Sequence, residues 1–116
     1  MKCSFDFDKT LSFEDVQDFA SELIQKGVEV WIVTARFDYD NKDVFEVAER
    51  LKISKEHIVF TNMYLKSEYF EKNEDFIWHL DDDSVELEFI NKDTKVKAIN
   101  VKNESCKREC LNLLKL

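Results

Sequence analysis

The chain alternates between two hydrophobic patterns, one typical of strands and one typical of helices. Residues 2–7 alternate between polar and apolar side chains, and residues 28–33 are an almost continuous apolar, β-branched run. Such a run is typical of a strand buried on both faces of a parallel sheet. Between them, residues 13–24 place apolar side chains at helical spacing, and Lys26 and Gly27 suit the end of a helix. These segments predict a βαβ unit.

The same alternation continues to the end of the chain. The remaining predicted elements are a helix from Asn41 to Leu51, strands at residues 58–60, 76–80 and 96–101, and helices at residues 65–71, near Ser84 and at residues 106–114. Strands that alternate with helices are typical of an α/β fold with a doubly wound parallel sheet. We therefore expect one α/β domain spanning residues 1–116.

Two polar residues are predicted to cap helices. Ser12, followed three residues later by Asp15, resembles a capping box, and Asn41 precedes the second predicted helix. A side-chain oxygen at this position accepts a hydrogen bond from a free backbone N–H group of the first turn. We therefore expect Ser12 and Asn41 to bond to the helices that they precede.

Length and composition exclude several classes of protein. The 116 residues suffice for one domain and leave no room for a second core. A hydrophobic fraction of 44%, a single glycine and the absence of proline exclude disordered and collagen-like chains. The net charge of −8 repels phosphate backbones and anionic membranes, which disfavours binding to extended nucleic acid. No apolar run approaches the ~18 residues of a membrane span, so we expect a cytoplasmic protein without a signal peptide.

The cysteines and one histidine have structural interpretations. Cys3, Cys106 and Cys110 are odd in number and widely spaced, which fits neither a disulfide framework nor a zinc site. Cys106 and Cys110 share a helix face and are expected to be packing residues. His79 lies inside a predicted strand, where alternation directs it away from the sheet edge or into a core pocket. We interpret His79 as structural.

Polar residues follow three of the predicted strands. Asp6 and Asp8 come after the first strand, Thr34 and Arg36 after the second, and the three aspartates at residues 81–83 after the fourth. In a parallel α/β sheet, ligands bind beyond the carboxyl ends of the strands. Carboxylates that converge there repel one another unless a cation lies between them, and an all-oxygen set favours a hard ion such as Mg²⁺. The sequence therefore predicts a magnesium site at this edge.

Each acidic group has a simpler interpretation when taken alone. An aspartate after a strand is often a turn residue or a helix cap, and residues 81–83 could cap the short helix near Ser84. A calcium-binding loop beginning at Asp6 is excluded, because Leu11 occupies the position that requires glycine and Gln17 the position of the bidentate glutamate.

Taken in chain order, these residues resemble the four motifs of the haloacid dehalogenase superfamily of phosphohydrolases. The matching residues are Asp6-x-Asp8-x-Thr10-Leu11 after the first strand, Thr34 after the second, Lys66, and Asp81-Asp82 after a later strand. The resemblance covers nearly the whole chain. It implies a Rossmann-like sheet of five strands in the order 5-4-1-2-3, dependence on Mg²⁺, and hydrolysis of a phosphate monoester through an aspartyl-phosphate.

The resemblance implies a role for each matched residue. Asp6 would be the nucleophile, Asp8 would protonate the leaving oxygen and later activate water, and Thr34 and Lys66 would hold the transferring phosphoryl group. A carboxylate that approaches a phosphate dianion meets like charge, so Mg²⁺ and a lysine must neutralise charge before in-line attack. In the family the metal is held by the first aspartate side chain, the backbone carbonyl of the second and an acid of the last motif. These positions are Asp6, Asp8 and either Asp82 or its neighbour Asp81.

Two cationic residues near the motifs have competing interpretations. Lys66 opens its predicted helix, which favours it over Lys72 as the phosphate-binding lysine. Arg36 could contact the phosphate of a substrate, but a surface ion pair with Asp38 or Asp40 is the favoured interpretation.

We expect no cap domain over the site, because only 31 residues separate Thr34 from Lys66 and the predicted helix and strand use most of them. An open site suits a phosphate displayed on a larger molecule, such as a polynucleotide end. A small substrate, such as a nucleotide, would instead require an oligomer to close the site.

Two other functions compete with a phosphatase. A catalytically silent binding module with the same fold is the alternative, but its usual sign is the loss of Asp6 or Asp8, and both are present. A phospho-receiver domain carries its acceptor aspartate after the third strand, where this chain has Phe60, Thr61 and Asn62. The receiver interpretation therefore fails at its central residue.

Overall fold

The computed structural model describes all 116 residues and has a parallel sheet at its centre. The five strands lie in the order β3-β2-β1-β4-β5. The predicted α/β class and the order 5-4-1-2-3 are confirmed, since that order is the same one counted from the opposite edge. The strands are β1 (Lys2–Phe5), β2 (Glu29–Thr34), β3 (Ile58–Phe60), β4 (Trp78–Asp81) and β5 (Lys97–Asn100).

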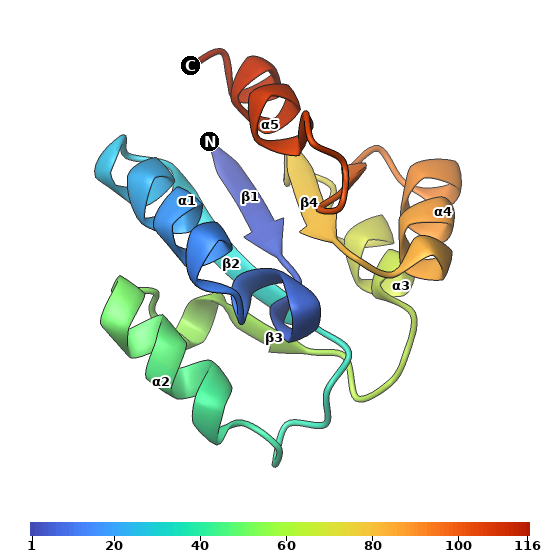
Figure 1. The fold of residues 1–116 in the computed structure, drawn as a ribbon. Helices are drawn as coiled ribbons and strands as arrows, with labels where there is room; N and C mark the ends of the chain where they lie inside the picture. Colours follow the sequence, from blue (N-terminus) through green and yellow to red (C-terminus); the bar gives the residue numbers. More distant parts are fainter.

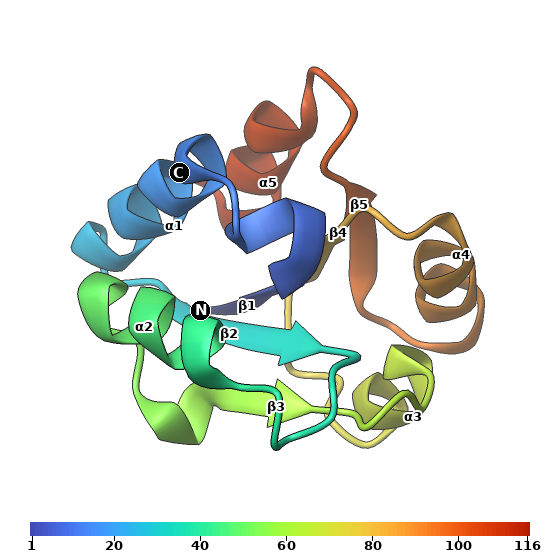
Figure 2. The same ribbon diagram turned by 60° about the horizontal axis from the view of Figure 1, so that its bottom comes forward.

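Helices cover both faces of this sheet (Figures 1 and 2). One face carries α1 (Glu14–Gln25), α2 (Lys42–Leu51) and α5 (Cys106–Leu114), and the other carries α3 (Lys66–Glu71) and α4 (Ser84–Asp93). Two short helical segments, η1 (Phe7–Leu11) and η2 (Lys55–His57), follow β1 and precede β3. None of the helices combines the length and the apolar character that crossing a membrane would require.

The two faces have separate hydrophobic cores. The larger core lies under α1, α2 and α5, where Phe5 contacts Phe19 and Trp78 edge to face at centroid distances of 6.2 and 5.4 Å. The smaller core lies under α3 and α4 and contains Phe70 and Phe76. All three cysteines are free and buried in the larger core, which confirms Cys106 and Cys110 as packing residues.

Neither predicted cap makes its side-chain bond to the helix, although Asn41 occupies the predicted N-cap position of α2. The Ser12 hydroxyl accepts a hydrogen bond from Lys9 N at 3.1 Å, and the residue that caps α1 is Phe13. Because η1 folds the chain back after β1, Ser12 meets the N–H group of that turn instead of the first turn of α1. Asn41 does precede α2, but its side chain donates to Asp38 O at 2.7 Å and makes no bond to the helix.

The carboxyl ends of the strands meet at one edge of the sheet (Figure 2). The fourth strand ends one residue later than the pattern predicts, so Asp81 is its last residue and pairs in register with Asn100. Asp81 is therefore part of the buried sheet, whereas Asp6 and residues 82–83 lie in the turns beyond it.

Candidate functional site

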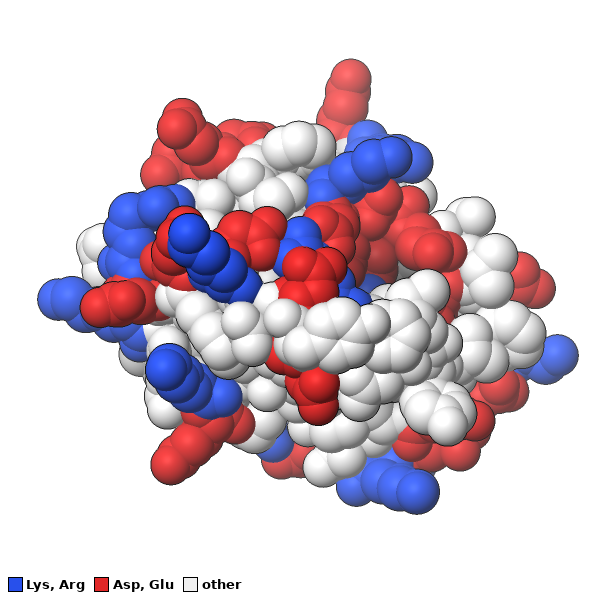
Figure 3. All heavy atoms as spheres, turned by 90° about the horizontal axis from the view of Figure 1, so that it is seen from below, with Lys and Arg blue, Asp and Glu red and all other residues white.

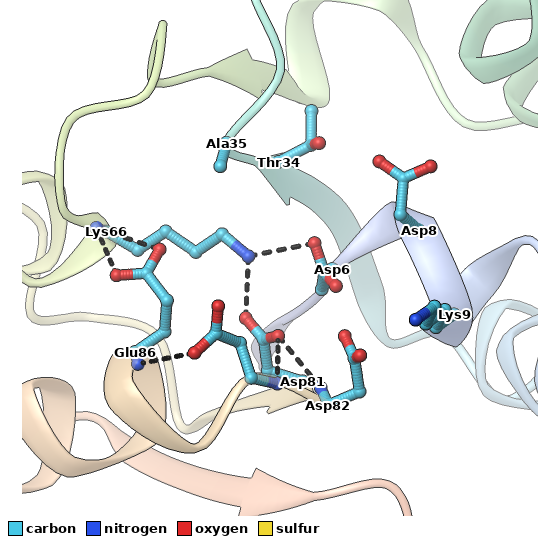
Figure 4. A pocket seen from close by; sticks show the side chains of 10 residues that line it. Asp6, Asp8, Lys9, Thr34, Ala35, Lys66, Asp81, Asp82 and Glu86 are labelled. Carbon is cyan, nitrogen blue, oxygen red and sulfur yellow. Dashed lines mark hydrogen bonds and ion pairs between the residues drawn. The ribbon is translucent and has the colours of Figure 1, made fainter.

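A pocket of about 210 Å³ lies beyond the carboxyl ends of β1, β2 and β4 (Figure 4). Its walls contain every residue that the sequence predicts for a site. Viewed onto this edge, acidic side chains gather around the pocket with lysine and arginine atoms between them (Figure 3). The lining residues are Asp6, Asp8, Lys9, Thr34, Ala35, Lys66, Asp81, Asp82, Asp83 and Glu86.

The turn after β1 fixes Asp6 in the pocket floor. Its backbone N–H donates to Leu80 O at 2.8 Å, and its carbonyl accepts from Leu11 N at 3.1 Å. The Thr10 hydroxyl donates to Asp6 Oδ2 at 3.4 Å, and the Leu11 side chain is fully buried in the core. Thr10 and Leu11 thus hold the turn in the shape that presents the Asp6 carboxylate.

Lys66 crosses the pocket from the first turn of α3 and lies between two carboxylates. Its Nζ donates to Asp6 Oδ1 at 2.8 Å and to Asp81 Oδ2 at 2.6 Å, and its side chain is only 2% exposed. Its backbone N–H donates to the Glu86 carboxylate at 3.2 Å, which ties α3 to α4. Lys72 is exposed at the far end of α3 and does not line the pocket. The structure therefore brings Lys66, and not Lys72, to the predicted site.

A buried hydrogen-bonded chain supports Asp81 from inside the sheet. His79 Nε2 lies 2.7 Å from Asp81 Oδ2, and His79 Nδ1 lies 2.7 Å from Ser4 Oγ. A carboxylate can only accept, so Nε2 carries the proton and the Ser4 hydroxyl donates to Nδ1. The interpretation of His79 as a residue inside the core is correct, and the structure adds that it orients Asp81.

The three consecutive aspartates have three different environments. Asp81 Oδ1 accepts from the backbone N–H groups of Asp82 and Asp83 at 2.8 and 3.1 Å. The Asp83 side chain caps α4 by accepting from the backbone N–H groups of Val85 and Glu86, which confirms the cap interpretation for this residue. The Asp82 carboxylate takes part in none of these bonds and points toward Asp6 (Figure 4).

Burial and charge set the protonation of this cluster. Burial raises the pKa of Asp6 to about 8; the Lys66 charge opposes this rise and the Asp81 charge adds to it. Burial acts on Asp81 in the same direction, but the bonds from His79 and Lys66 outweigh it and hold the pKa of Asp81 below its usual range. Burial lowers the pKa of His79, which favours the neutral form of its imidazole. Although burial disfavours the ammonium of Lys66, the two carboxylates raise the pKa of Lys66. The two carboxylates thus share one ammonium, and the surrounding bonds favour the ionised form of Asp81 over that of Asp6.

Asp8 lies at the outer wall of the pocket in an ion pair with Arg36. Arg36 Nε and Nη2 donate to the two oxygens of Asp8 at 2.9 and 2.7 Å. The same guanidinium donates to both oxygens of Asp43, and its Nη1 lies 3.7 Å from Asp40 Oδ1. The predicted pairing with Asp40 is confirmed and that with Asp38 is wrong, because the Asp38 side chain makes no contact with Arg36. The partners Asp8 and Asp43 were not predicted.

Three carboxylates in the pocket have the spacing of a metal site. Asp6, Asp81 and Asp82 each offer an oxygen atom, and these atoms lie within 4.8 Å of one another. Oxygen atoms are the ligands that Mg²⁺ prefers. Both oxygens of Asp81 already accept two hydrogen bonds each, whereas the Asp82 carboxylate has none of them. Asp8 contributes no side-chain oxygen to this group.

Several residues of the site were not found from the sequence. Lys9 lines the pocket with a left-handed backbone at φ 57°, and Glu86 holds the backbone of Lys66. His79 and Asp81 are two residues apart in one strand, so their side chains share a face. That spacing is the one signal that could have predicted the contact between them. Nothing comparable marks Glu86 among the other acidic residues.

We predict that Lys66→Met destabilises the fold by about 3–5 kcal/mol, because it leaves two buried carboxylates without their cation. The loss should shrink between pH 8 and pH 5. Without the ammonium, the pKa values of Asp6 and Asp81 rise further in the folded variant than in the folded wild type. The folded variant therefore takes up more protons as the pH falls, and gains more stability, than the wild type. Urea unfolding of the variant and the wild type at both pH values measures this.

Lys72→Met is the matched control, since it removes a lysine from the exposed end of the same helix. Its free energy of unfolding should stay within about 0.5 kcal/mol of the wild type. Equal losses from the two variants would contradict the compensating role of Lys66.

Neither a protein-family model nor a curated protein matches this chain. The side chains of the pocket therefore indicate which chemistry the chain can perform. A carboxylate held against a fixed ammonium group, beside two further carboxylates spaced for a divalent cation, is an arrangement that can bind and transfer a group carrying negative charge.

Proposed function

We propose that the protein is a Mg²⁺-dependent phosphatase that hydrolyses a phosphate monoester through an aspartyl-phosphate on Asp6. The observation that carries the proposal is the contact between Asp6 and Lys66 inside a pocket that also contains Asp81 and Asp82. The chain order of these residues, with Asp8 and Thr34, resembles the haloacid dehalogenase superfamily. A silent binding module is less well supported, because Asp6 and Asp8 both line the pocket.

The first step is an in-line displacement at phosphorus. An oxygen of Asp6 forms a bond to phosphorus while the bond from phosphorus to the ester oxygen breaks, and the electron pair leaves with that oxygen. Lys66 donates to the phosphoryl oxygens and offsets their charge. Thr34, buried at the end of β2, lines the same pocket, and its hydroxyl oxygen accepts a hydrogen bond from Arg36 N at 3.3 Å.

Asp8 is the acid and base of the two steps. As an acid it gives a proton to the departing oxygen; as a base it then takes a proton from the water that attacks phosphorus and breaks the bond to Asp6. In the structure Arg36 binds the ionised form of Asp8, so the carboxyl must leave Arg36 to act as an acid. Arg36 retains Asp43 and Asp40 as partners, which lowers the cost of this exchange.

The donor set fits Mg²⁺. Asp6 and Asp82 would hold it, together with the Asp8 backbone carbonyl that the resemblance implies. Asp82 is preferred to Asp81 because the oxygens of Asp81 are already bonded. When bound, the ion supplies positive charge that offsets the phosphoryl group and favours the ionised form of Asp6. Three carboxyl groups, those of Asp6, Asp81 and Asp82, face the single ammonium group of Lys66. This excess of negative charge favours the binding of Mg²⁺ in addition to the lysine.

We predict that Asp6→Asn lowers phosphate release from p-nitrophenyl phosphate in Mg²⁺ by roughly a thousandfold or more, because the amide keeps the shape but is not a nucleophile. Circular dichroism should show an unchanged fold. Asp93→Asn is the control, since this exposed residue at the end of α4 lies outside the pocket. Turnover of Asp6→Asn within tenfold of the wild type would contradict the covalent mechanism.

Asp8→Asn should act selectively. Loss of a general acid costs roughly 10²–10⁴ in rate when the leaving group is an alkyl alcohol, and much less for p-nitrophenolate, which departs without a proton. Steady-state rates on glycerol phosphate and p-nitrophenyl phosphate measure the difference. Equal losses on both esters would remove Asp8 from the acid role.

Mg²⁺ should stabilise the folded protein. At a free concentration ten times the dissociation constant the gain is about 1.4 kcal/mol, which raises the melting midpoint by roughly 5 °C for a chain of this size. Asp82→Asn should raise the metal-free midpoint, by relieving repulsion, and reduce the response to Mg²⁺. Thermal melts of both proteins with and without 10 mM Mg²⁺ test this.

Asp93→Asn should melt like the wild type under both conditions. The metal site would be refuted by a wild type that does not respond to Mg²⁺, or by an Asp93→Asn protein that behaves like Asp82→Asn.

A further inference from the structure

Two loops lie beside the pocket, residues 35–39 and residues 62–65. We call these two loops the rim. The first loop follows β2 and the second follows β3, and Figure 2 shows both at the carboxyl edge of the sheet. The pocket residues Thr34 and Ala35 lead directly into the first loop, and Leu65 of the second leads directly into Lys66. The rim therefore adjoins the pocket at two separate points.

Hydrogen bonds join the two loops into one unit. Met63 N donates to Ala35 O at 2.7 Å, Asn62 N to Arg36 O at 3.1 Å, and Asp38 N to Asn62 Oδ1 at 3.0 Å. Asn62 and Met63 have left-handed backbones, with φ of 53° and 70°. Asparagine adopts this conformation fairly readily, but for Met63 it is costly and persists only where the surrounding bonds enforce it. The two loops of the rim are therefore held in a defined conformation.

Most of the side chains that this surface presents to solvent are apolar or aromatic, and Asp38 is the exposed charged residue among them. Five of the ten large exposed hydrophobic residues of the chain lie here. Tyr39 and Tyr64 are 77% and 69% exposed, and Phe37 stacks on Tyr39 at 5.4 Å with an interplanar angle of 14°. In Figure 3 an uncharged area adjoins the acidic side chains of the pocket. The other three exposed hydrophobic residues of the rim are Phe37, Met63 and Leu65. Apolar residues scattered singly over a surface need no explanation, but such a concentration beside a pocket marks a binding surface.

The charges around the pocket restrict what can lie on the rim. Six acidic residues and two lysines line the pocket. A phosphoryl group can be accommodated at Lys66, but a second anionic group on the same ligand meets repulsion. Flat neutral rings, in contrast, stack favourably on tyrosine.

We infer that the rim binds the leaving group of the substrate and that this group carries an uncharged planar ring. The inference rests on the proposed phosphatase function and names its substrate class, a phosphate monoester of a ring-bearing alcohol or phenol. Nucleoside monophosphates and aryl phosphates share this chemistry. In this arrangement the phosphoryl group lies at Lys66 and the ring stacks on an exposed tyrosine of the rim, Tyr39 or Tyr64. Tyr64 also lines a hollow beside α3 with Tyr69 and Lys72.

Adenosine 5′-monophosphate and ribose 5-phosphate provide the test, because they are esters of the same primary hydroxyl and differ by the adenine ring. Binding is measured by calorimetry in 10 mM Mg²⁺ with the Asp6→Asn protein, which prevents turnover. The nucleotide should bind at least about tenfold more tightly, on the scale of one stacked base. Replacing both Tyr39 and Tyr64 by alanine in that protein should remove the difference and leave the affinity for ribose 5-phosphate unchanged.

Leu113→Ala is the matched control, because Leu113 is an exposed hydrophobic residue of α5, outside the rim. It should change neither affinity. Phenyl phosphate distinguishes a nucleoside monophosphate from an aryl phosphate as the substrate. Weaker binding than the nucleotide identifies a nucleotide substrate, and tighter binding identifies an aryl ester.

Equal affinities for the nucleotide and ribose 5-phosphate would overturn the inference, as would equal losses of both in the tyrosine variant. A tyrosine variant that dissociates a dimer while leaving both affinities intact would also overturn it and make the rim an interface between copies. Phosphate release by the wild type is measured separately. A ring preference without any release would refute the phosphatase and leave ring binding by the rim established.

Discussion

The burial of one ammonium group among carboxylates is the interaction on which the rest of the site depends. Lys66 is almost completely withdrawn from water, so the free energy of its hydration must be replaced by bonds of good geometry. Asp6 and Asp81 supply these bonds from β1 and β4, and His79 and Ser4 complete the chain behind them. No buried side-chain nitrogen or oxygen lacks a partner. The network can therefore hold a fixed shape before any ligand arrives.

Charge balance explains how an acidic protein could accept the anionic substrate that we propose. The negative side chains around the pocket are each committed to a local partner: Asp8 to Arg36, Asp83 to the start of α4, and Glu86 to the backbone of Lys66. Asp82 is the exception. The net charge of −8 therefore repels an anion less at the pocket than elsewhere on the surface. The negative charge that has no local partner lies where a divalent cation would bind.

Much of this arrangement could be predicted because a parallel sheet brings the ends of its strands together. Asp6, Thr34 and Asp81 were assigned to one edge from periodicity alone, and the structure places them there. What could not be predicted depends on side-chain directions across elements. Lys66 is predicted over Lys72 because it opens its helix, but the two carboxylates that its ammonium contacts depend on the orientation of α3. The bond from Arg36 to Asp8 joins residues 28 positions apart. The prediction that Ser12 caps α1 is wrong because its hydroxyl oxygen accepts a hydrogen bond from Lys9 N of η1 instead.

The connectivity of the Lys66 network also constrains how the chain acquires its structure. Asp6 and Lys66 are 60 residues apart, and Ser4 and His79 are 75 apart. During synthesis, the first strand and its aspartate leave the ribosome long before α3 supplies Lys66 and before β4 and α4 supply the acids that bind that lysine. An amino-terminal fragment that ends before α4 lacks Glu86, and one that ends before β4 lacks Asp81 as well, so neither can bury Lys66 at low cost. Assembly of the pocket is thus coupled to completion of the sheet, so the arrangement around Lys66 forms late and cooperatively during folding.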